Sequence, residues 1–183
     1  LDLKKMPVWI HCKGYLVRDD NTKPLYMIGC INEIGERQKA DNVSGLLGET
    51  GLRQYMDQQD TPMEKGYLLR IGIDHFKEIN DNFGQEYGDF VLRKTADCIS
   101  GCLSEGQKVY KLVADEFLIL DVSSDEVKDA DKLYDKVRNE IDRFIESNEF
   151  KVMYTVSGGI VPFAALKGNQ YSEALKLTDF ALN

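Results

Sequence analysis

Apolar and polar residues follow two different patterns along the chain, and the pattern changes near residue 40. Residues 7–18 and 24–32 are rich in β-forming residues and are separated by a polar turn, DDNTK, which is typical of a β-hairpin. An isolated hairpin is only marginally stable in water, so this one is expected to need a neighbouring strand or domain. Residues 33–42 are polar and predict a helical connector.

Beyond the connector, residues 43–183 predict an α/β domain in the order helix, strand, two helices, antiparallel hairpin, long helix, strand and helix. The most apolar strand, GYLLRIGI at 66–73, is of the kind that is buried on both faces. The expected helices are 50–58, 75–81, 87–103, 125–147 and 172–182, and the other strands are 109–112, 116–121 and 151–161. The predicted fold is a mixed central sheet flanked by helices, with the N-terminal hairpin as an appendage.

Composition and charge narrow the class of protein. The chain has 183 residues, of which 43% are hydrophobic and 30% charged, as in ordinary soluble globular proteins. A formal net charge of −8 argues against nucleic-acid binding. No apolar run approaches the roughly 20 residues that span a bilayer, so no membrane segment is expected here. Because the chain begins at Leu1 and stops at Asn183 inside an apolar-periodic stretch, we expect it to be a piece of a longer protein.

The four cysteines lack the spacing of a metal site. No C-x-x-C pair occurs, and only two histidines are available to complete a zinc site. Cys98 and Cys102 lie four residues apart on a predicted helix and are expected to be small core residues. We therefore expect reduced thiols and a cytoplasmic location.

Polar groups gather after the buried strand and on the second hairpin. The stretch DHFKEINDNFGQEYGD at 74–89 follows the carboxyl end of the strand, where α/β sheets usually bind ligands. Asp115 and Glu116 lie at the tip of the hairpin, and the strand order predicts that this tip neighbours the end of the buried strand. Adjacent carboxylates on a turn suit a hard divalent cation that takes its other ligands from water and phosphates. For an Asp-Glu pair alone, a solvated acidic turn is the alternative.

Together these segments resemble the GGDEF family of diguanylate cyclases. The resemblance runs from DNVSGL at 41–46, similar to the family's D-x-L-T-G-L, through the block at 72–89 to VADEF at 113–117. It continues through TVS at 155–157 to Asp179 in the last helix. It implies a nucleotidyl cyclase, palm-like fold and a domain that binds GTP with Mg²⁺ as a homodimer.

The N-terminal hairpin resembles the last two strands of a PAS sensor domain, which commonly precedes a GGDEF domain through a helical connector. On this interpretation residues 1–32 are a PAS fragment, residues 33–42 are the connector helix, and residues 43–183 are a GGDEF domain with a truncated last helix. The fragment is too short to sense a ligand by itself. The family also implies a possible fused or partner phosphodiesterase domain.

The resemblance assigns substrate-binding roles to five positions. Asn80 and Asp89 match the residues that hydrogen-bond the guanine base, and both residue types are retained. The segment with His75 and Phe76 matches the part whose backbone meets metal and phosphates. Lys77 is placed to balance phosphate charge, although a solvated helix lysine is an equal alternative.

The metal-binding positions are only partly retained. Asp115 matches a metal-binding carboxylate, Glu116 the residue proposed to bind the second metal or activate the attacking hydroxyl, and the Ile73 backbone a further metal ligand. The family's other metal-binding aspartate falls at Gly72, so that carboxylate is missing. Asp74, which comes just after the strand, is expected to point to the other face.

The hairpin also departs from the family, because Val113 and Ala114 replace both glycines of the signature. Tight turns often need a positive φ, which costs an L-residue about 1 kcal/mol, and a Cβ blocks close approach of phosphate to backbone. Triphosphate binding is expected to weaken. The family's product-inhibition motif R-x-x-D would fall at 104–107, which reads SEGQ, so feedback by cyclic di-GMP at that site is not expected.

Three interpretations of function remain open. The first is a degenerate GGDEF domain that binds GTP or acts as a regulatory or dimerisation module with little or no cyclase activity. The second is an active diguanylate cyclase, which the retained Asp115, Glu116, Asn80 and Asp89 favour. The third is an interaction module that binds no nucleotide.

Overall fold

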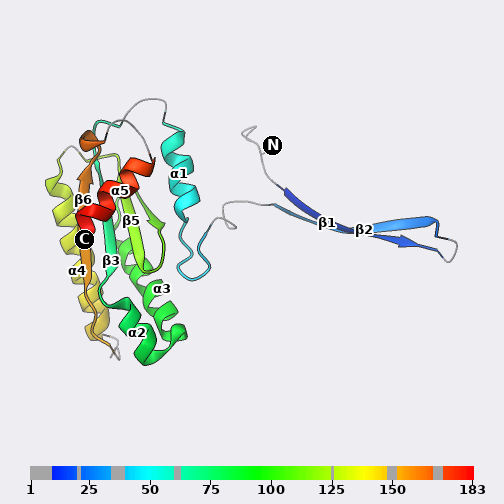
Figure 1. The fold of residues 1–183 in the computed structure, drawn as a ribbon, viewed down its shortest axis with the longest axis horizontal. Helices are drawn as coiled ribbons and strands as arrows, with labels where there is room; N and C mark the ends of the chain where they lie inside the picture. The colour runs from blue at the N-terminus through cyan, green and yellow to red at the C-terminus, as the bar shows by residue number, and fades with distance from the viewer. Residues whose placement is uncertain are drawn as a thin grey trace. The chain divides into compact units, whose positions relative to one another are not determined.

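The computed structural model describes residues 10–19, 22–33, 40–59, 63–124, 126–147, 152–166 and 171–183, and the chain divides into two compact units. In the first unit, Leu1–Lys39, strand β1 (Ile10–Arg18) pairs antiparallel with strand β2 (Pro24–Glu33) (Figure 1). The N-terminal hairpin is therefore confirmed. Its assignment to a PAS domain stays a prediction.

The expected connector helix meets other structure at both of its ends. Glu33 is the last residue of β2, and Ala40 forms a β-bridge with Leu47. The Asp41 N–H donates to the Leu46 carbonyl oxygen at 2.7 Å, which closes a compact turn at the start of the second unit. Residues 34–39 lie outside the described residues, so a helix there stays a prediction.

The second unit, Ala40–Asn183, contains a four-stranded sheet in the order β4-β5-β3-β6. Strand β3 (Tyr67–Ile73) lies between β5 (Glu116–Asp121) and β6 (Val156–Pro162), and β4 (Gln107–Lys111) pairs with β5. All of these pairs are antiparallel, and an isolated parallel bridge joins Gly48 to Lys111. The central position of β3 explains why its sequence is almost continuously apolar: only Arg70 in it is partly exposed.

Helices cover both faces of this sheet (Figure 1). One apolar cluster joins α3 and α4 to Leu69 and Ile71 of β3, and α2 packs on α3. A second cluster joins α1 to Leu68 and to β5, and α5 packs on α1, β3 and β6. The helices are α1 (Glu49–Asp57), α2 (Phe76–Phe83), α3 (Gln85–Cys102), α4 (Lys128–Ser147) and α5 (Tyr171–Leu182). Because side chains alternate along β3, Arg70 and Gly72 share the face that α5 covers.

The predicted α/β architecture is thus confirmed, with shifts at some element ends. The strand expected from residue 151 begins at Val156, although Tyr154 is buried in the core and the Thr155 carbonyl oxygen accepts the Asp74 N–H at 2.9 Å. Cys98 and Cys102 are buried in α3 as expected, and burial raises the pKa of the Cys98 thiol to about 11. None of the helices in the described part of the chain has the length and apolar character that crossing a membrane requires.

Candidate functional site

The carboxyl end of β3 and the tip of the β4–β5 hairpin lie side by side, as the sequence predicted. Gly72 faces Glu116 in the strand register, and the Ile73 N–H donates to the Asp115 carbonyl oxygen at 3.4 Å. On the other side, Gly72 pairs with Ser157 of β6. The end of β3 and the hairpin tip therefore bring the predicted metal positions together, and β6 lies on the other side of β3.

The hairpin tip is a four-residue turn that the Glu116 N–H closes by donating to the Val113 carbonyl oxygen at 3.3 Å. Its second residue, Ala114, has a φ of 54°, and glycine is the preferred residue for a positive φ at this position. Ala114 therefore carries the strain that the sequence predicted. Val113 does not, because its φ is not positive and its side chain is 70% exposed. The expected conformational cost at Val113 was wrong, since the turn places only its second residue in the left-handed region.

A buried lysine, which the sequence analysis did not single out, holds this turn from inside. Lys111 Nζ donates to the carbonyl oxygen of Leu112 at 3.0 Å and also to that of Ala114. Burial lowers the pKa of Lys111, while the charges of Asp41, Asp115 and Glu116 act in the opposite direction. Beside this ammonium group, burial and the nearby carboxylate of Glu116 raise the pKa of Asp115, against the effect of its backbone hydrogen bond. The clue in the sequence was a charged residue ending a strand whose last positions are buried.

Glu116, the predicted catalytic residue, is held by an arginine from the neighbouring strand. Arg70 Nε donates to Glu116 Oε2 at 3.0 Å, and a second guanidinium nitrogen contacts the same oxygen. The guanidinium group also lies 3.1 Å from Asp179 Oδ1 and donates to the Leu175 carbonyl oxygen at 3.2 Å. Sequence analysis treated Arg70 as part of an apolar strand. A charged residue in a buried strand needs a partner, and that was the available signal.

The positions of Gly72 and Asp74 bear directly on metal binding. A Cβ atom at Gly72 would lie 3.8 Å from Glu116 Cγ and 3.3 Å from Leu182 Cδ2, so a carboxylate there would stand beside Glu116. Asp74 instead accepts hydrogen bonds from the hydroxyl groups of Thr155 and, at 2.7 Å, Ser157. Ser157 faces Gly72 in the strand register, so the Asp74 carboxylate lies on the same face of the sheet as Gly72, held by β6 and the residue before it. The expectation that Asp74 points to the other face was wrong, because residues two positions apart on a strand share a face.

These residues do not by themselves fit a magnesium ion. Within the described ranges, no three His, Cys, Asp or Glu side chains converge as a metal site. Glu116 is paired with Arg70, and Asp74 is bonded to β6. Only Asp115 remains, whereas magnesium requires near-octahedral coordination by oxygen atoms. A metal would depend on nucleotide phosphates for most of its ligands.

The predicted guanine-binding residues lie where α2 and α3 meet. Gly84, with a φ of +85°, turns the chain between the two helices. A Cβ atom at Gly88 would lie 1.9 Å from Asn80 Oδ1, so this glycine makes room for the Asn80 amide. Asn80 Oδ1 is buried and has no hydrogen-bond partner among the described residues, which is unusual for a native polar atom. Asp89 follows directly on α3.

The predicted phosphate-binding segment begins α2. His75 precedes the helix with a φ of 57°, and its Nδ1 lies 3.1 Å from Glu78 Oε1. In the first helical turn, the Glu78 N–H donates to the His75 carbonyl oxygen at 2.9 Å, whereas the N–H groups of Phe76 and Lys77 have no acceptor within the helix and suit phosphate oxygens. Lys77 is exposed, so both interpretations of this lysine stay open.

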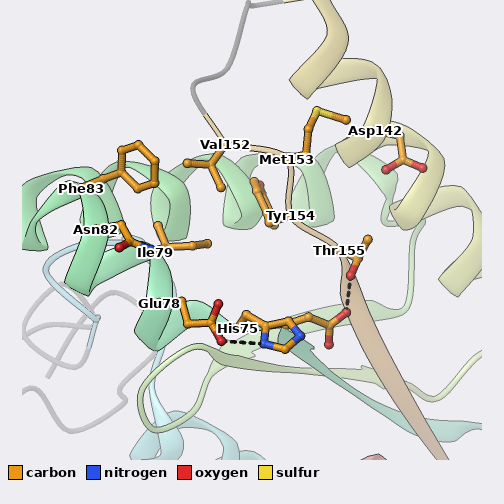
Figure 2. Close-up of a pocket in the computed structure, with 11 residues that line it drawn as sticks. His75, Glu78, Ile79, Asn82, Phe83, Asp142, Val152, Met153, Tyr154 and Thr155 are labelled. Atoms are coloured by element: carbon orange, nitrogen blue, oxygen red, sulfur yellow. Dashed lines mark hydrogen bonds and ion pairs between the residues drawn. The ribbon is translucent and has the colours of Figure 1, made fainter.

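A pocket of about 340 Å³ lies next to this segment, between α2, α4 and residues 152–155. Figure 2 shows the apolar side chains of Phe83, Val152 and Met153 along one side and the His75–Glu78 pair on another. Asn80, Asp89 and Asp115 do not line it. The pocket is therefore distinct from the residues predicted to bind guanine and metal.

Comparison with known proteins agrees with this arrangement. The family profile described as "Diguanylate cyclase, GGDEF domain" matches residues 40–183. Diguanylate cyclase DgcZ of Escherichia coli is 34% identical over 86 residues, which cover 46% of this chain and 29% of that protein. Diguanylate cyclase VdcA of Vibrio cholerae is 26% identical over 113 residues, covering 60% of this chain and 33% of that protein. The matched region is thus about a third or less of each relative.

Solved structures match over a larger share of the chain. The isolated GGDEF domain of TpbB, also named YfiN, from Pseudomonas aeruginosa is 26% identical with a TM-score of 0.64, covering 78% of this chain and 86% of that one. Diguanylate cyclase SiaD of the same species, in complex with its activator SiaC, has a TM-score of 0.66 at 24% identity, covering 80% and 57%. The likeness to SiaD concerns the fold alone.

Proposed function

Because residues 40–183 belong to the GGDEF diguanylate cyclase domain family, we propose that this domain binds GTP as a regulatory module of cyclic di-GMP signalling, with little or no cyclase activity. The observation that carries the proposal is Gly72. Its Cβ direction leads to Glu116, so the strand and the hairpin are in register for a carboxylate that the chain lacks.

The guanine-binding half of the site supports retained nucleotide binding. Asn80 keeps a buried acceptor without a partner, and Asp89 follows on α3 within reach of the same helix junction. The first turn of α2 offers N–H groups to phosphate oxygens. In the family, the 3′-hydroxyl of one GTP attacks the α-phosphate of another across a homodimer. Without a carboxylate at residue 72, stabilisation of the developing charge is reduced in both subunits.

The test is an incubation of the dimeric protein with GTP and Mg²⁺, followed by chromatography for cyclic di-GMP. Binding of GTP without measurable product is expected. Asp89→Asn should weaken GTP binding at least tenfold, whereas the same change at the exposed Asp81 should have little effect, because only Asp89 is assigned to the base. Robust turnover by the unchanged protein would refute the proposal.

An active diguanylate cyclase is the second candidate, and the retained pair of Asp115 and Glu116 favours it. The triple variant Gly72→Asp, Val113→Gly, Ala114→Gly tests whether the departures limit the rate, and a gain of product is expected. The third candidate is an interaction module that binds no nucleotide. A binding experiment that detects affinity for GTP would exclude it.

The same proposal extends to the wider protein. We propose a cytoplasmic signalling chain in which the β1–β2 hairpin ends a PAS sensor and a phosphodiesterase domain is fused or recruited. One comparison supports the phosphodiesterase part of this proposal: cyclic di-GMP phosphodiesterase PdeR of Escherichia coli is 29% identical over 138 residues, covering 63% of this chain and 21% of that protein.

A further inference from the structure

We infer that Arg70 supplies the positive charge that a metal ion would otherwise supply to Glu116, so that an ion-pair network closes this end of the sheet. The inference rests on the proposed function in one respect, the assignment of Gly72 as the position of a missing metal-binding carboxylate. It adds that the Glu116 carboxylate at the hairpin tip already has a positively charged partner in this chain, without a divalent metal.

The strand register brings Arg70 and Glu116 together. Arg70 faces Leu118 and Gly72 faces Glu116 on the adjacent strands, so Arg70 and Glu116 are diagonal neighbours on one face of the sheet. The guanidinium group uses both Nε and a terminal nitrogen on one carboxylate oxygen. Such a fork fixes the direction of the carboxylate.

Helix α5 supplies the remaining partners of the Arg70 guanidinium group. The Leu175 carbonyl oxygen and the Asp179 carboxylate take further contacts of the guanidinium group. Leu182, seven residues after Leu175, places its Cδ2 atom 3.3 Å from where a Cβ of residue 72 would lie. These three α5 residues follow the spacing of one helix face. The same face therefore binds Arg70 and covers the place of the missing carboxylate with an apolar group.

Charge and burial make a divalent ion unfavourable at Glu116. The Arg70 side chain is only 11% exposed and the Glu116 side chain 23%, so water screens the pair weakly. A guanidinium group stays protonated under all physiological conditions. A metal ion that approached Glu116 would be repelled by this fixed positive charge, which already occupies the Oε2 atom. Asp115 would remain as a single carboxylate ligand.

The experiment measures binding of Mn²⁺ alone to the full chain by electron paramagnetic resonance, without nucleotide. The unchanged protein should show no saturable Mn²⁺ site up to about 1 mM, a range in which weak carboxylate sites bind. The double variant Arg70→Leu, Gly72→Asp should gain a saturable Mn²⁺ site whose affinity is at least tenfold above the limit set by the unchanged protein. The matched control is Arg138→Leu, Gly72→Asp, which removes a positive charge from an exposed position on α4 and should gain little.

Saturable Mn²⁺ binding to the unchanged protein that Glu116→Gln abolishes would overturn the inference. So would equal gains in the two double variants. If Arg70→Leu does not fold, Arg70→Gln with Gly72→Asp replaces it, and unchanged Mn²⁺ behaviour of Glu116→Gln in the parent chain still supports the inference. Cyclic di-GMP production is assayed separately: product without a Mn²⁺ site refutes only the proposed function, and a Glu116-dependent Mn²⁺ site without product refutes only the role of Arg70.

Discussion

At the residue scale, Gly66 is a position where an added methyl group would collide with the backbone of a neighbouring strand. Its φ is +89°, and a Cβ atom would lie 1.9 Å from the backbone oxygen of Asp121. We expect Gly66→Ala to lower the free energy of unfolding by roughly 2–4 kcal/mol, because the left-handed backbone is strained and β5 must shift. Urea unfolding followed by circular dichroism measures this. Gly101→Ala, a helical position with open space around it, should instead gain about 0.5–1 kcal/mol; similar losses in both variants would contradict the argument.

Asp121 is the residue through which stability should depend on acidity. Its buried carboxylate accepts hydrogen bonds from Gln107 Nε2 at 2.8 Å and from the backbone N–H and hydroxyl groups of Ser123 and Ser124. Burial raises the pKa of Asp121, but these hydrogen bonds outweigh it and hold the pKa well below its usual value. A depressed pKa stabilises the fold above the unfolded value of about 3.9, and this stabilisation is lost as pH falls from there through the folded pKa.

The corresponding measurement is urea unfolding of Asp121→Asn across a pH series. At pH 7 the variant should lose about 1–3 kcal/mol, because an amide cannot accept all of these bonds. The difference from the parent protein should shrink as pH falls below about 4, since the parent then loses the same contribution. Asp142→Asn, at an exposed position on α4, is the control and should change stability by less than about 0.5 kcal/mol. A constant difference at all pH values would contradict the assignment.

At the scale of elements, the β4–β5 hairpin separates the two glycine replacements. Ala114 has a φ of 54°, so Ala114→Gly should stabilise the domain by about 1 kcal/mol. Val113 has no positive φ, so Val113→Gly should cost about 0.5–1 kcal/mol by giving the unfolded chain more freedom. Thermal unfolding of the two single variants tests this directly. Equal shifts in the same direction would show that turn geometry does not distinguish them.

Periodicity in the sequence was enough to predict most of these elements, but not their long-range partners. The apolar run of β3 and the stripe on α3 with Val91, Ala96 and Ile99 predict burial directly, since each depends on neighbours along the chain. Arg70 contacts residues 46 and 105 positions away, and no local pattern specifies such partners. Lys111 was missed for a different reason: its partners are only one and three positions away, but its amino group reaches their carbonyl oxygens only because the chain folds back at the turn.

At the scale of the whole molecule, only one of the two faces of the sheet carries Arg70, Gly72 and Glu116. The face under α3 and α4 carries the larger apolar cluster, and the buried Asp121 and Lys111 lie opposite Tyr67 and Phe117 of that cluster. The face under α5 combines an apolar cluster with Arg70, Gly72 and Glu116. Substitutions that change the chemistry of the hairpin tip are therefore expected to act through α5 while leaving the other layer intact.

The division into two units predicts that Ala40–Asn183 folds without the N-terminal hairpin. A chain of residues 40–183 should unfold cooperatively, with a free energy of unfolding within about 0.5 kcal/mol of that of the full chain, because it keeps both apolar clusters.

A chain that starts at residue 46 is the matched control. It loses the Asp41 carboxylate, which accepts the N–H and hydroxyl of Ser44 at 2.7 Å, and the bridge from Ala40 to Leu47. That chain should be less stable by about 1–2 kcal/mol. Urea unfolding of the three chains compares them, and a large loss already in residues 40–183 would mean that the hairpin contributes to the stability of the second unit.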